Sequence, residues 1–578
     1  MKAIFKITLA AGTAAAAMDV CKGQTWDTTV LANYPVWGTW MFGRADTCDW
    51  MEALTAFHKI GGKAVLMFGP SFEKIPDTTS NPSHAAMTDC IDQGQGCFTK
   101  AKSDLQALNP GSTVVNYIIY QAGNWYGNQV MKCPAYDKKI VVTLGSGVKR
   151  TYWRIVLPHT SAFTCPQNGG TYDVLFTYFD GADSTRDQTD MVTRCAAYTG
   201  MEAWPGMPSI PNFPNASWQV DQSLLPAFYE WSDRVLSDWN TRFGSRPSFK
   251  GVYQAFEYVF DTSAYWLNVY DVEGFTSSIV HSKLPGKKVF NSPYWVYNQQ
   301  TGPGQTLAMI KAAYKKVARK GVDIIAPQDG RGAGLAAYYW PYQASDQIST
   351  VDYRLSVYPS VAPGATFATQ FSGSIDDGMA ALRDATEELK TENVFTELWS
   401  NLEAFESGTR TDGQPEPYCL VWFQPFARTN KQRLDWALTH QGAKPTRFIS
   451  YMWDSYYYCT STAVPATLAD EIQSDATRPI ASEAFPFGGG IIIRGYNVAA
   501  PGTQFECTWY DSTWNLHTAV VSMDWWNMGW GALNNRSLLL QEAHIPFSMS
   551  NMAPNFYVHI RPQTSAGVQA YFQHSMKY

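Results

Sequence analysis

The 578-residue sequence predicts an α/β protein: a (β/α)8 TIM barrel that carries an inserted disulfide-rich β subdomain and a C-terminal β-sandwich. Three observations lead to this prediction. Eight short apolar runs alternate with amphipathic helical segments between residues 34 and 454, which is the pattern of parallel strands joined by helices. Residues 71–198 interrupt the alternation with β-like runs and five cysteines. Beyond residue 479 only short strands follow, at the spacing of a sandwich.

The barrel strands are expected at eight places in chain order, namely Tyr34–Phe42, Lys63–Gly69, Gly200–Pro208, Phe249–Glu257, Lys288–Tyr294, Val322–Asp329, Val394–Glu403 and Thr446–Asp454. Amphipathic segments typical of helices lie at about 48–60, 224–243, 264–282, 304–320, 376–391 and 431–441. Eight such units make one closed barrel, which insertions lengthen beyond the usual size.

Residues 71–198 are too many for a bare loop, and no long amphipathic helix is evident among their β-like runs, Val114–Tyr120, Lys139–Leu144, Tyr152–Leu157 and Tyr172–Phe179. The C-terminal strands are expected at Gly490–Arg494, Gln504–Trp509, His517–Met523, Ser537–Gln541, Phe556–Ile560 and Val568–Phe572. The predicted domains are therefore a barrel over 18–478, which includes the subdomain at 71–198, and a β-sandwich over 479–578.

The first residues predict export. A positively charged start, Met1–Lys6, precedes the apolar stretch Ile7–Ala17, which is the pattern of a signal peptide over residues 1–17. No second apolar run reaches the ~20 residues of a membrane span. We therefore expect a secreted, extracellular monomer without a membrane anchor. Two sequons, Asn215-Ala-Ser and Asn535-Arg-Ser, are compatible with glycosylation on that route.

Ten cysteines, an even number, agree with an oxidising compartment, and we expect all of them to pair. Seven precede residue 200 and three follow residue 400. Because both numbers are odd, complete pairing requires at least one bridge between the two ends of the chain.

Composition and motifs exclude several classes of partner. With 44 Lys+Arg against 50 Asp+Glu, and no basic cluster, nucleic acid is not an expected ligand. No Cys-x-x-Cys or His-Glu-x-x-His motif supports a metal, and we expect no cofactor. The glycine-rich segment Gly330–Leu335 lacks the dinucleotide-binding spacing and runs into Tyr338-Tyr-Trp-Pro rather than a helix. The absence of a Gly-x-Ser-x-Gly motif argues against an esterase of the usual hydrolase fold.

Two glutamates end the fourth and seventh expected strands. Reacting groups in such barrels come from the C-terminal ends of strands, so Glu257 and Glu403 are expected over one pocket. Two converging carboxylates suit glycoside hydrolysis. Glu397 lies six residues before Glu403 on the same strand face, about 20 Å away at ~3.3 Å per residue, and is expected at the opposite rim. The alternatives to this pair of carboxylates are Glu202, Glu406 and Asp329.

Further residues at or near strand ends are candidates for contact with a sugar. Aromatic residues make up 15% of the chain, with 22 tryptophans, and flat rings provide stacking surfaces for sugars as well as core mass. The expected substrate-binding residues are Asp329, Gln328, Tyr253, Asn401, Trp204, Tyr294, Trp295, Trp399, Trp453 and Asp454. For about half of these aromatic residues a purely structural role in the core is the competing interpretation.

The stretch from about Phe249 to Asp454, with Ile325–Gly332 and Leu398–Glu406, resembles a barrel family described only as a domain of unknown function. That family is similar to the clan of retaining barrel glycosidases whose acid/base ends strand four and whose nucleophile ends strand seven. The resemblance implies Glu257 as acid/base and Glu403 as nucleophile, although Phe256 stands where the clan commonly has Asn.

The expected function is therefore a secreted glycoside hydrolase that cleaves an extracellular or cell-wall polysaccharide, or an oligosaccharide, by a retaining double displacement. The alternative is a non-catalytic carbohydrate-binding or cell-wall protein on the same barrel scaffold.

Overall fold

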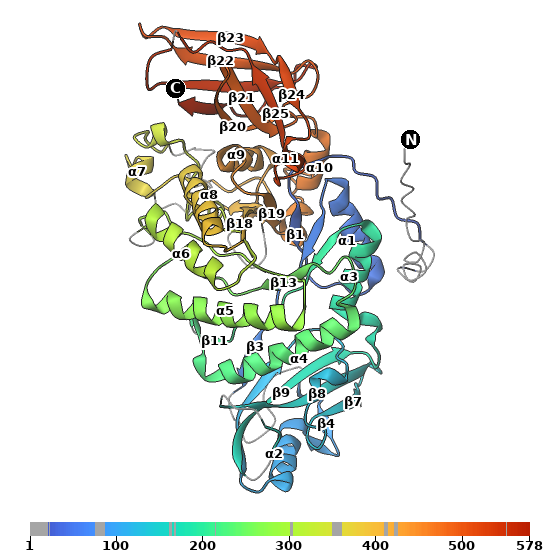
Figure 1. Ribbon diagram of the computed structural model, residues 1–578. Helices are drawn as coiled ribbons and strands as arrows, with labels where there is room; N and C mark the ends of the chain where they lie inside the picture. Colours follow the sequence, from blue (N-terminus) through green and yellow to red (C-terminus); the bar gives the residue numbers. More distant parts are fainter. Residues whose placement is uncertain are drawn as a thin grey trace, which may run out of the picture.

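The computed structural model describes residues 21, 24–75, 87–160, 164–166, 169–213, 216–300, 304–349, 361–409, 414–420, 426–550 and 552–577. It places the barrel between the inserted subdomain at one end of the molecule and the C-terminal β domain at the other (Figure 1). The predicted signal peptide and Asn215 lie outside the described residues.

An eight-stranded parallel sheet forms the barrel, as predicted. Its strands, in spatial order, are β10 (Glu202–Trp204), β2 (Ala64–Leu66), β1 (Gly38–Trp40), β19 (Arg447–Tyr451), β16 (Glu397–Glu403), β15 (Ile324–Ile325), β14 (Lys288–Asn291) and β13 (Gly251–Gln254). Two single bridges, Ala203 with Phe249 and Gly206 with Tyr253, join the outermost strands β10 and β13 and bring the ring close to closure. Each predicted barrel strand contains one of these eight.

Helices cover the outside of the barrel. They are α1 (Thr47–Lys59), α3 (Gln188–Thr199), α4 (Leu225–Phe243), α5 (Ala264–Lys283), α6 (Leu307–Arg319), α8 (Ile375–Thr391) and α9 (Lys431–Gln441). In α6 the residues Ile310, Tyr314 and Val317 recur at helical spacing and are buried, while Lys316 and Arg319 end the helix. Polar caps start several of these helices; the Ser374 hydroxyl, for example, accepts from the Asp377 N–H at the start of α8.

Shorter elements complete the barrel domain. They are the hairpins β11 (Asn212–Phe213) with β12 (Ala216–Val220) and β17 (Phe405–Ser407) with β18 (Phe426–Arg428), the helices α7 (Phe367–Gln370) and α10 (Leu468–Ser474), and a π-helical turn over Trp453–Tyr457. No helix in the described part of the chain has the length and apolar character of a membrane span.

The insertion after β2 is a separate layer with its own apolar core. Its mixed five-stranded sheet has the order β3 (Phe72–Ile75), β6 (Ser112–Tyr120), β9 (Gly170–Asp180), β8 (Lys149–Pro158) and β7 (Lys138–Thr143), beside the small pair β4 (Ile91–Asp92) and β5 (Gln95–Gly96). No long helix was predicted among the β-like runs between residues 114 and 179, and the two helices of this region lie before and after those runs. Helix α2 (Cys97–Leu108) packs on this sheet, and α3 packs against α1 as part of the barrel layer.

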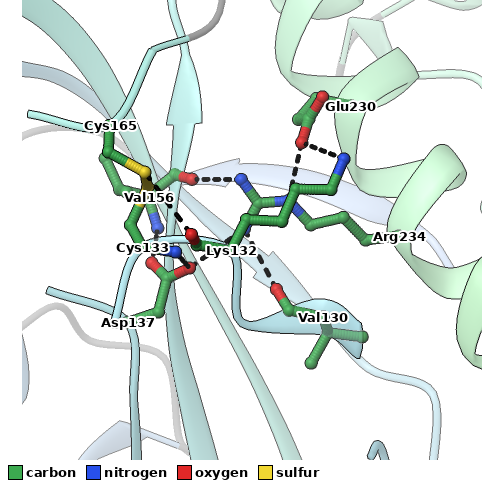
Figure 2. Close-up of a disulfide and its surroundings, with 8 residues drawn as sticks. All are labelled: Val130, Lys132, Cys133, Asp137, Val156, Cys165, Glu230 and Arg234. Carbon is green, nitrogen blue, oxygen red and sulfur yellow. Dashed lines mark hydrogen bonds and ion pairs between the residues drawn. A yellow bond between two sulfur atoms is a disulfide. The ribbon is translucent and has the colours of Figure 1, made fainter. Parts of the chain in front are cut away.

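A buried ion pair joins the insertion to the barrel (Figure 2). Arg234 of α4 pairs with Asp137 at 3.1 Å, and both side chains are inaccessible to solvent. The guanidinium also donates to the carbonyls of Val130 (3.0 Å) and Val156 (3.1 Å). The Asp137 carboxylate accepts in addition from the N–H groups of Cys133 and Val156. The insertion is therefore anchored by one fully hydrogen-bonded arginine beside the Cys133–Cys165 disulfide.

The C-terminal domain consists of two four-stranded antiparallel sheets around a third core. One sheet has the order β20 (Ile480–Phe487), β21 (Gly490–Tyr496), β25 (Gln541–Ile545) and β24 (Trp525–Asn527), and the other β23 (Leu516–Ser522), β22 (Gln504–Tyr510), β26 (Tyr557–Gln563) and β27 (His574–Lys577). The strand predicted over Ser537–Gln541 is mostly a turn after the short helix α11 (Trp530–Leu533), and β25 begins only at Gln541.

The prediction that all ten cysteines pair was wrong. The disulfides are Cys21–Cys48, Cys90–Cys97, Cys133–Cys165 and Cys419–Cys459, so none joins the two ends of the chain. Cys195 on α3 and Cys507 on β22 are free and buried in different cores. The odd numbers in each half therefore leave one thiol in each half.

Thiol titration of the unfolded, unreduced protein is therefore expected to find two thiols, and titration of the folded protein none. Burial raises the pKa of both Cys195 and Cys507 to about 12, so neither forms a reactive thiolate at neutral pH. Fewer than two thiols after unfolding would show that the remaining pair is bridged, and a rapidly reacting thiol in the native protein would contradict the burial.

Candidate active site

A pocket of about 550 Å³ opens at the C-terminal ends of the barrel strands, where such barrels carry their reacting groups. Each lining residue lies at the end of a barrel strand or in the segment that follows one. The lining residues are Glu257, Tyr294, Val296, Gln328, Ala333, Leu335, Asn401, Glu403, Phe405, Phe426, Tyr451 and Tyr456. Both predicted catalytic glutamates are thus in one pocket.

Glu257 comes from the segment that follows β13 and is open to the pocket. Its Oε1 atom accepts from the Gln328 amide at 3.3 Å, and Gln328 also donates to the carbonyl of Ser292. Solvent reaches the carboxyl, yet protein surrounds it on its other sides. This partial burial raises the pKa of Glu257, against the opposing effect of the Gln328 hydrogen bond.

Glu403 ends β16 and is 1% exposed. Its Oε2 atom accepts from the Ala333 N–H at 3.0 Å, whereas Oε1 has no hydrogen-bond partner within the described protein. Gly332 makes this contact possible, because a Cβ atom there would lie 2.3 Å from the Phe405 carbonyl oxygen and 2.9 Å from Oε2 of Glu403. The glycine-rich segment after β15 therefore brings backbone N–H groups to a carboxylate, not to a phosphate.

A buried network of opposite charges supports Glu403 from below. Arg331 donates to the carbonyl of Glu403 (2.8 Å) and lies 3.5 Å from the carboxylate of Glu406, which also pairs with Arg433. Asp329 accepts from the Tyr338 hydroxyl at 2.6 Å and from the Arg331 N–H at 3.1 Å. Three carboxylates and two guanidiniums thus meet under the pocket floor.

Burial raises the pKa of Glu403, and the negative charge of Asp329 raises it further, while Arg331 and the backbone N–H of Ala333 oppose the shift. Burial raises the pKa of Asp329 too, against its hydrogen bonds and Arg331. Asp329 has donors on both oxygens and Glu403 on one only. The hydrogen bonds therefore favour the ionised form of Asp329 more than that of Glu403.

Aromatic rings form one wall of the pocket. Phe405 packs against Phe426 (centroids 4.8 Å apart), Tyr456 (5.2 Å) and Tyr451 (5.9 Å). These rings come from β17, β18, the end of β19 and the π-helical turn after it. The wall gives the pocket an apolar surface beside the two carboxyls, which is the kind of surface on which the C–H face of a sugar ring stacks.

The predicted substrate-binding residues fall into three groups. Gln328, Asn401 and Tyr294 line the pocket, and Asp329 lies beneath it. The side chains packed away from the pocket are Tyr253, Trp204 and Trp399, which pack with Phe290 in the barrel interior, and Trp295, whose indole donates to the Asp329 carbonyl. Trp453 and Asp454 line a different cavity, where Asp454 pairs with Arg44.

Side-chain alternation along a strand does not separate the pocket from the barrel interior, because both lie on the inward face and differ only in depth. Trp399 illustrates this, since it shares a face with Glu403 but lies near the other rim, where its indole donates to Glu397. Glu397 itself pairs with Lys288 at the rim opposite Glu403, as predicted.

Sequence reasoning missed Arg331 and the aromatic wall, which consists of Phe405, Phe426, Tyr451 and Tyr456. The available signal for Arg331 was the segment Gly330-Arg-Gly directly after a strand end, where glycines allow close backbone approach. For a metal there is no comparable arrangement: within the described residues, no group of three or more His, Cys, Asp or Glu side chains is placed to hold an ion.

A family model described as a domain of unknown function, DUF8405, matches residues 77–179. The match lies in the inserted subdomain, whereas the residues that resemble a barrel family lie between about 249 and 454. No curated protein matches the sequence.

Solved structures with a similar arrangement include two glycosidases. An endo-β-1,4-mannanase from Thermotoga petrophila is 9% identical, with 95% of this chain and 99% of that chain covered and a TM-score of 0.36. A β-galactosidase from Marinomonas ef1 is 8% identical, with 76% of this chain and 59% of that one covered and a TM-score of 0.33. At these TM-scores the likeness carries no argument about activity, which has to come from the pocket itself.

Proposed function

We propose that the protein is a secreted glycoside hydrolase that cleaves a polysaccharide by a retaining double displacement. One observation carries the proposal: Glu257, three residues after the end of β13, and Glu403, at the end of β16, line the same pocket as an aromatic wall. Two carboxyl groups are the reacting groups of glycoside hydrolysis, and an apolar aromatic surface beside them can stack against a sugar ring. Four disulfides support an extracellular setting.

In the proposed reaction Glu257 is the general acid. Its proton goes to the glycosidic oxygen as the bond from that oxygen to the anomeric carbon breaks, and Oε1 of Glu403 forms a bond to that carbon. Glu257 then takes a proton from water, whose oxygen attacks the anomeric carbon and releases Glu403. The unpartnered Oε1 atom suits this role, because the Ala333 N–H already holds the other oxygen.

The site must lose a proton before it can react, since an attacking carboxylate must be ionised. Asp329→Asn removes the neighbouring negative charge that raises the pKa of Glu403. We therefore expect the acid limb of the pH profile of kcat/KM to move to lower pH in this variant. Measurement over pH 4 to 9, beside Asp323→Asn on the opposite rim as a control, checks this. An acid limb that stays in place or moves upward would contradict the coupling.

The pocket favours a neutral sugar. No lysine or arginine is among the described residues that line it, so nothing there would pair with the carboxylate of a uronic acid. Amide groups of Gln328 and Asn401 are available for hydroxyl groups.

Incubation with a panel of neutral and uronic-acid polysaccharides, followed by an assay for new reducing ends, tests the proposed function. We expect reducing ends from a neutral polysaccharide. Binding without reducing ends would instead support the non-catalytic carbohydrate-binding alternative, and preference for a polyuronate would contradict the inference of a neutral substrate.

The C-terminal domain is expected to be separable from the chemistry. Every described residue of the pocket precedes residue 457, whereas Trp525 is exposed on β24 and Trp530 is partly buried against Arg494. Trp525→Ala with Trp530→Ala should weaken binding to a polysaccharide at most and spare turnover of a short substrate. Loss of that turnover in a folded variant would show that this domain completes the active site.

A further inference from the structure

Four buried polar side chains lie behind the pocket, between helix α5 and the outer face of β13 and β14. Gln254 and Asn291 are register partners at the ends of the two strands. The Gln254 amide donates to the backbone carbonyl of Glu273 on α5 at 3.1 Å and to the Thr276 hydroxyl at 2.7 Å. The side chain of Tyr258 lies near both Glu273 and Asn291. None of the four exceeds 2% exposure.

Most polar atoms of this cluster have no protein partner. Both carboxyl oxygens of Glu273, both amide atoms of Asn291, Oε1 of Gln254 and the hydroxyl of Tyr258 lack a hydrogen bond within the described protein. Burial of unpaired polar atoms is costly, and six together at a helix–sheet contact point to partners other than protein atoms. Buried water satisfies such a set, because each molecule makes two to four hydrogen bonds as donor and acceptor, so two molecules are enough for six atoms.

The cluster contains one ionisable carboxyl and no compensating cation. Within the described residues Glu273 has no ion pair, and burial alone raises its pKa to about 8. The titratable groups that face it are Tyr253 and Tyr258 from the barrel side and Tyr229 from α4, and none of these is a cation. Lys320, whose stem packs against the next residue of α5, is paired with Asp271 instead.

We propose that Glu273 is a positioning residue: in its neutral acid form it shares an internal water site with Gln254, Asn291 and Tyr258, and so fixes the segment that carries Glu257. The connection is short, because Tyr258 is the residue after Glu257.

The backbone holds the same segment from its other side. The carbonyl of Tyr258 accepts from the N–H of Tyr294, which lines the pocket, at 3.0 Å. The segment is thus held by a strand-like bridge on one side and by the Tyr258 side chain in the cluster on the other. The role assigned to Glu257 rests on the proposed function, whereas the neutral carboxyl and its water site do not.

Unfolding by urea between pH 5 and 8 tests the neutral carboxyl without any substrate. The folded protein keeps a proton that an unfolded glutamate releases above about pH 4.5, so wild-type stability falls as the pH rises through this window. Relative to Glu273→Gln, the unfolding constant of wild type should rise about tenfold per pH unit. An equal pH dependence of the two proteins would overturn the proposal. So would stability that follows Na⁺ or K⁺ concentration, because it would indicate an ionised carboxylate with a bound cation.

Leaving-group dependence tests the positioning role. Glu273→Leu cannot hold the water, so it should lower kcat/KM at least tenfold for an unactivated glycoside but little for its 4-nitrophenyl counterpart, which needs no proton from Glu257. Val280→Ala, a buried substitution on the same helix, should show no such difference. Glu273→Gln should retain the wild-type ratio between the two substrates, because its amide still holds the water, and a changed ratio in this variant would contradict the role given to the neutral acid. If Glu273→Leu does not fold, Tyr258→Phe, which removes another member of the cluster, should show the leaving-group dependence instead, and its absence would overturn the positioning role. An equal loss for both substrates in Glu273→Leu would overturn the positioning role.

Failure of this inference is distinguishable from failure of the proposed function. If wild type hydrolyses no glycoside while the urea result holds, the proposed function fails and the neutral carboxyl stands. If wild type is active but Glu273→Leu, Glu273→Gln and Val280→Ala all have the same ratio of kcat/KM between the unactivated and the 4-nitrophenyl glycoside, only the positioning role fails.

Discussion

Glu403→Gln should abolish turnover and leave the protein folded. Glutamine keeps the shape of the side chain and can still accept the Ala333 N–H, but its amide cannot form the bond to the anomeric carbon. We expect kcat to fall by roughly 10⁴ or more, the usual loss for a missing nucleophile. Because the substitution also removes a buried carboxyl with a raised pKa, the free energy of unfolding at neutral pH should not decrease.

Glu397→Gln is the matched control, since it changes the other glutamate of β16 at the opposite rim, where it pairs with Lys288. It should retain activity within a few-fold of wild type. An active Glu403→Gln enzyme would remove the nucleophile role and direct attention to Glu406 or Asp329.

The acid/base role gives a second signature at the same site. Glu257→Gln should cost roughly 10² to 10⁴ in rate, and least for substrates whose leaving group needs no proton.

Retention is checked by the anomer formed first, and it corresponds to a carboxyl separation of ~5 to 5.5 Å against ~6.5 to 9.5 Å for inversion. An inverted first product would exclude the double displacement but not hydrolysis.

Arg234→Met should destabilise the fold strongly. It would leave the Asp137 carboxylate without its cation, and the carbonyls of Val130 and Val156 without the guanidinium donor, in a region closed to solvent (Figure 2). Removal of one partner from such a buried pair costs about 3–5 kcal/mol in the free energy of unfolding. Chemical unfolding followed by circular dichroism measures the loss.

Arg319→Met provides the comparison, because Arg319 forms an exposed bidentate pair with Glu392 and should change stability by less than ~1 kcal/mol. A double change, Arg234→Met with Asp137→Leu, should recover part of the loss, since no charge then remains buried. Equal effects of Arg234→Met and Arg319→Met would show that the buried pair does not anchor the insertion.

Local patterns identified the eight barrel strands and the two glutamates at strand ends, because strand periodicity and helix amphipathicity are properties of neighbouring residues. They did not identify the helices within 71–198. In α3 the buried face is formed by small and polar-looking residues such as Thr193, Cys195 and Ala196, and its burial comes from contacts with α1 and β10, which are distant in the chain or follow later.

The prediction that all ten cysteines form disulfides was wrong for a related reason. An even number of cysteines leads to complete pairing only if each thiol lies within bonding distance of another. Cys195 and Cys507 are buried in different cores. Likewise, the aromatic candidates were chosen at strand ends, but Trp204 and Trp399 lie deep in the barrel and Trp453 lines another cavity.

The sequence by itself determined the barrel, its insertion, its C-terminal β domain and the two strands at whose C-terminal ends Glu257 and Glu403 lie, since each follows from residues close together in the chain. Only the tertiary structure decided which groups surround the carboxyls. Arg331, Asp329 and the Ala333 N–H lie close to Glu403 although about 70 residues of sequence separate them from it. Their charges, together with burial, set the pKa of Glu403. Proton affinity depends on distance and dielectric in three dimensions, and no spacing along a chain encodes it directly.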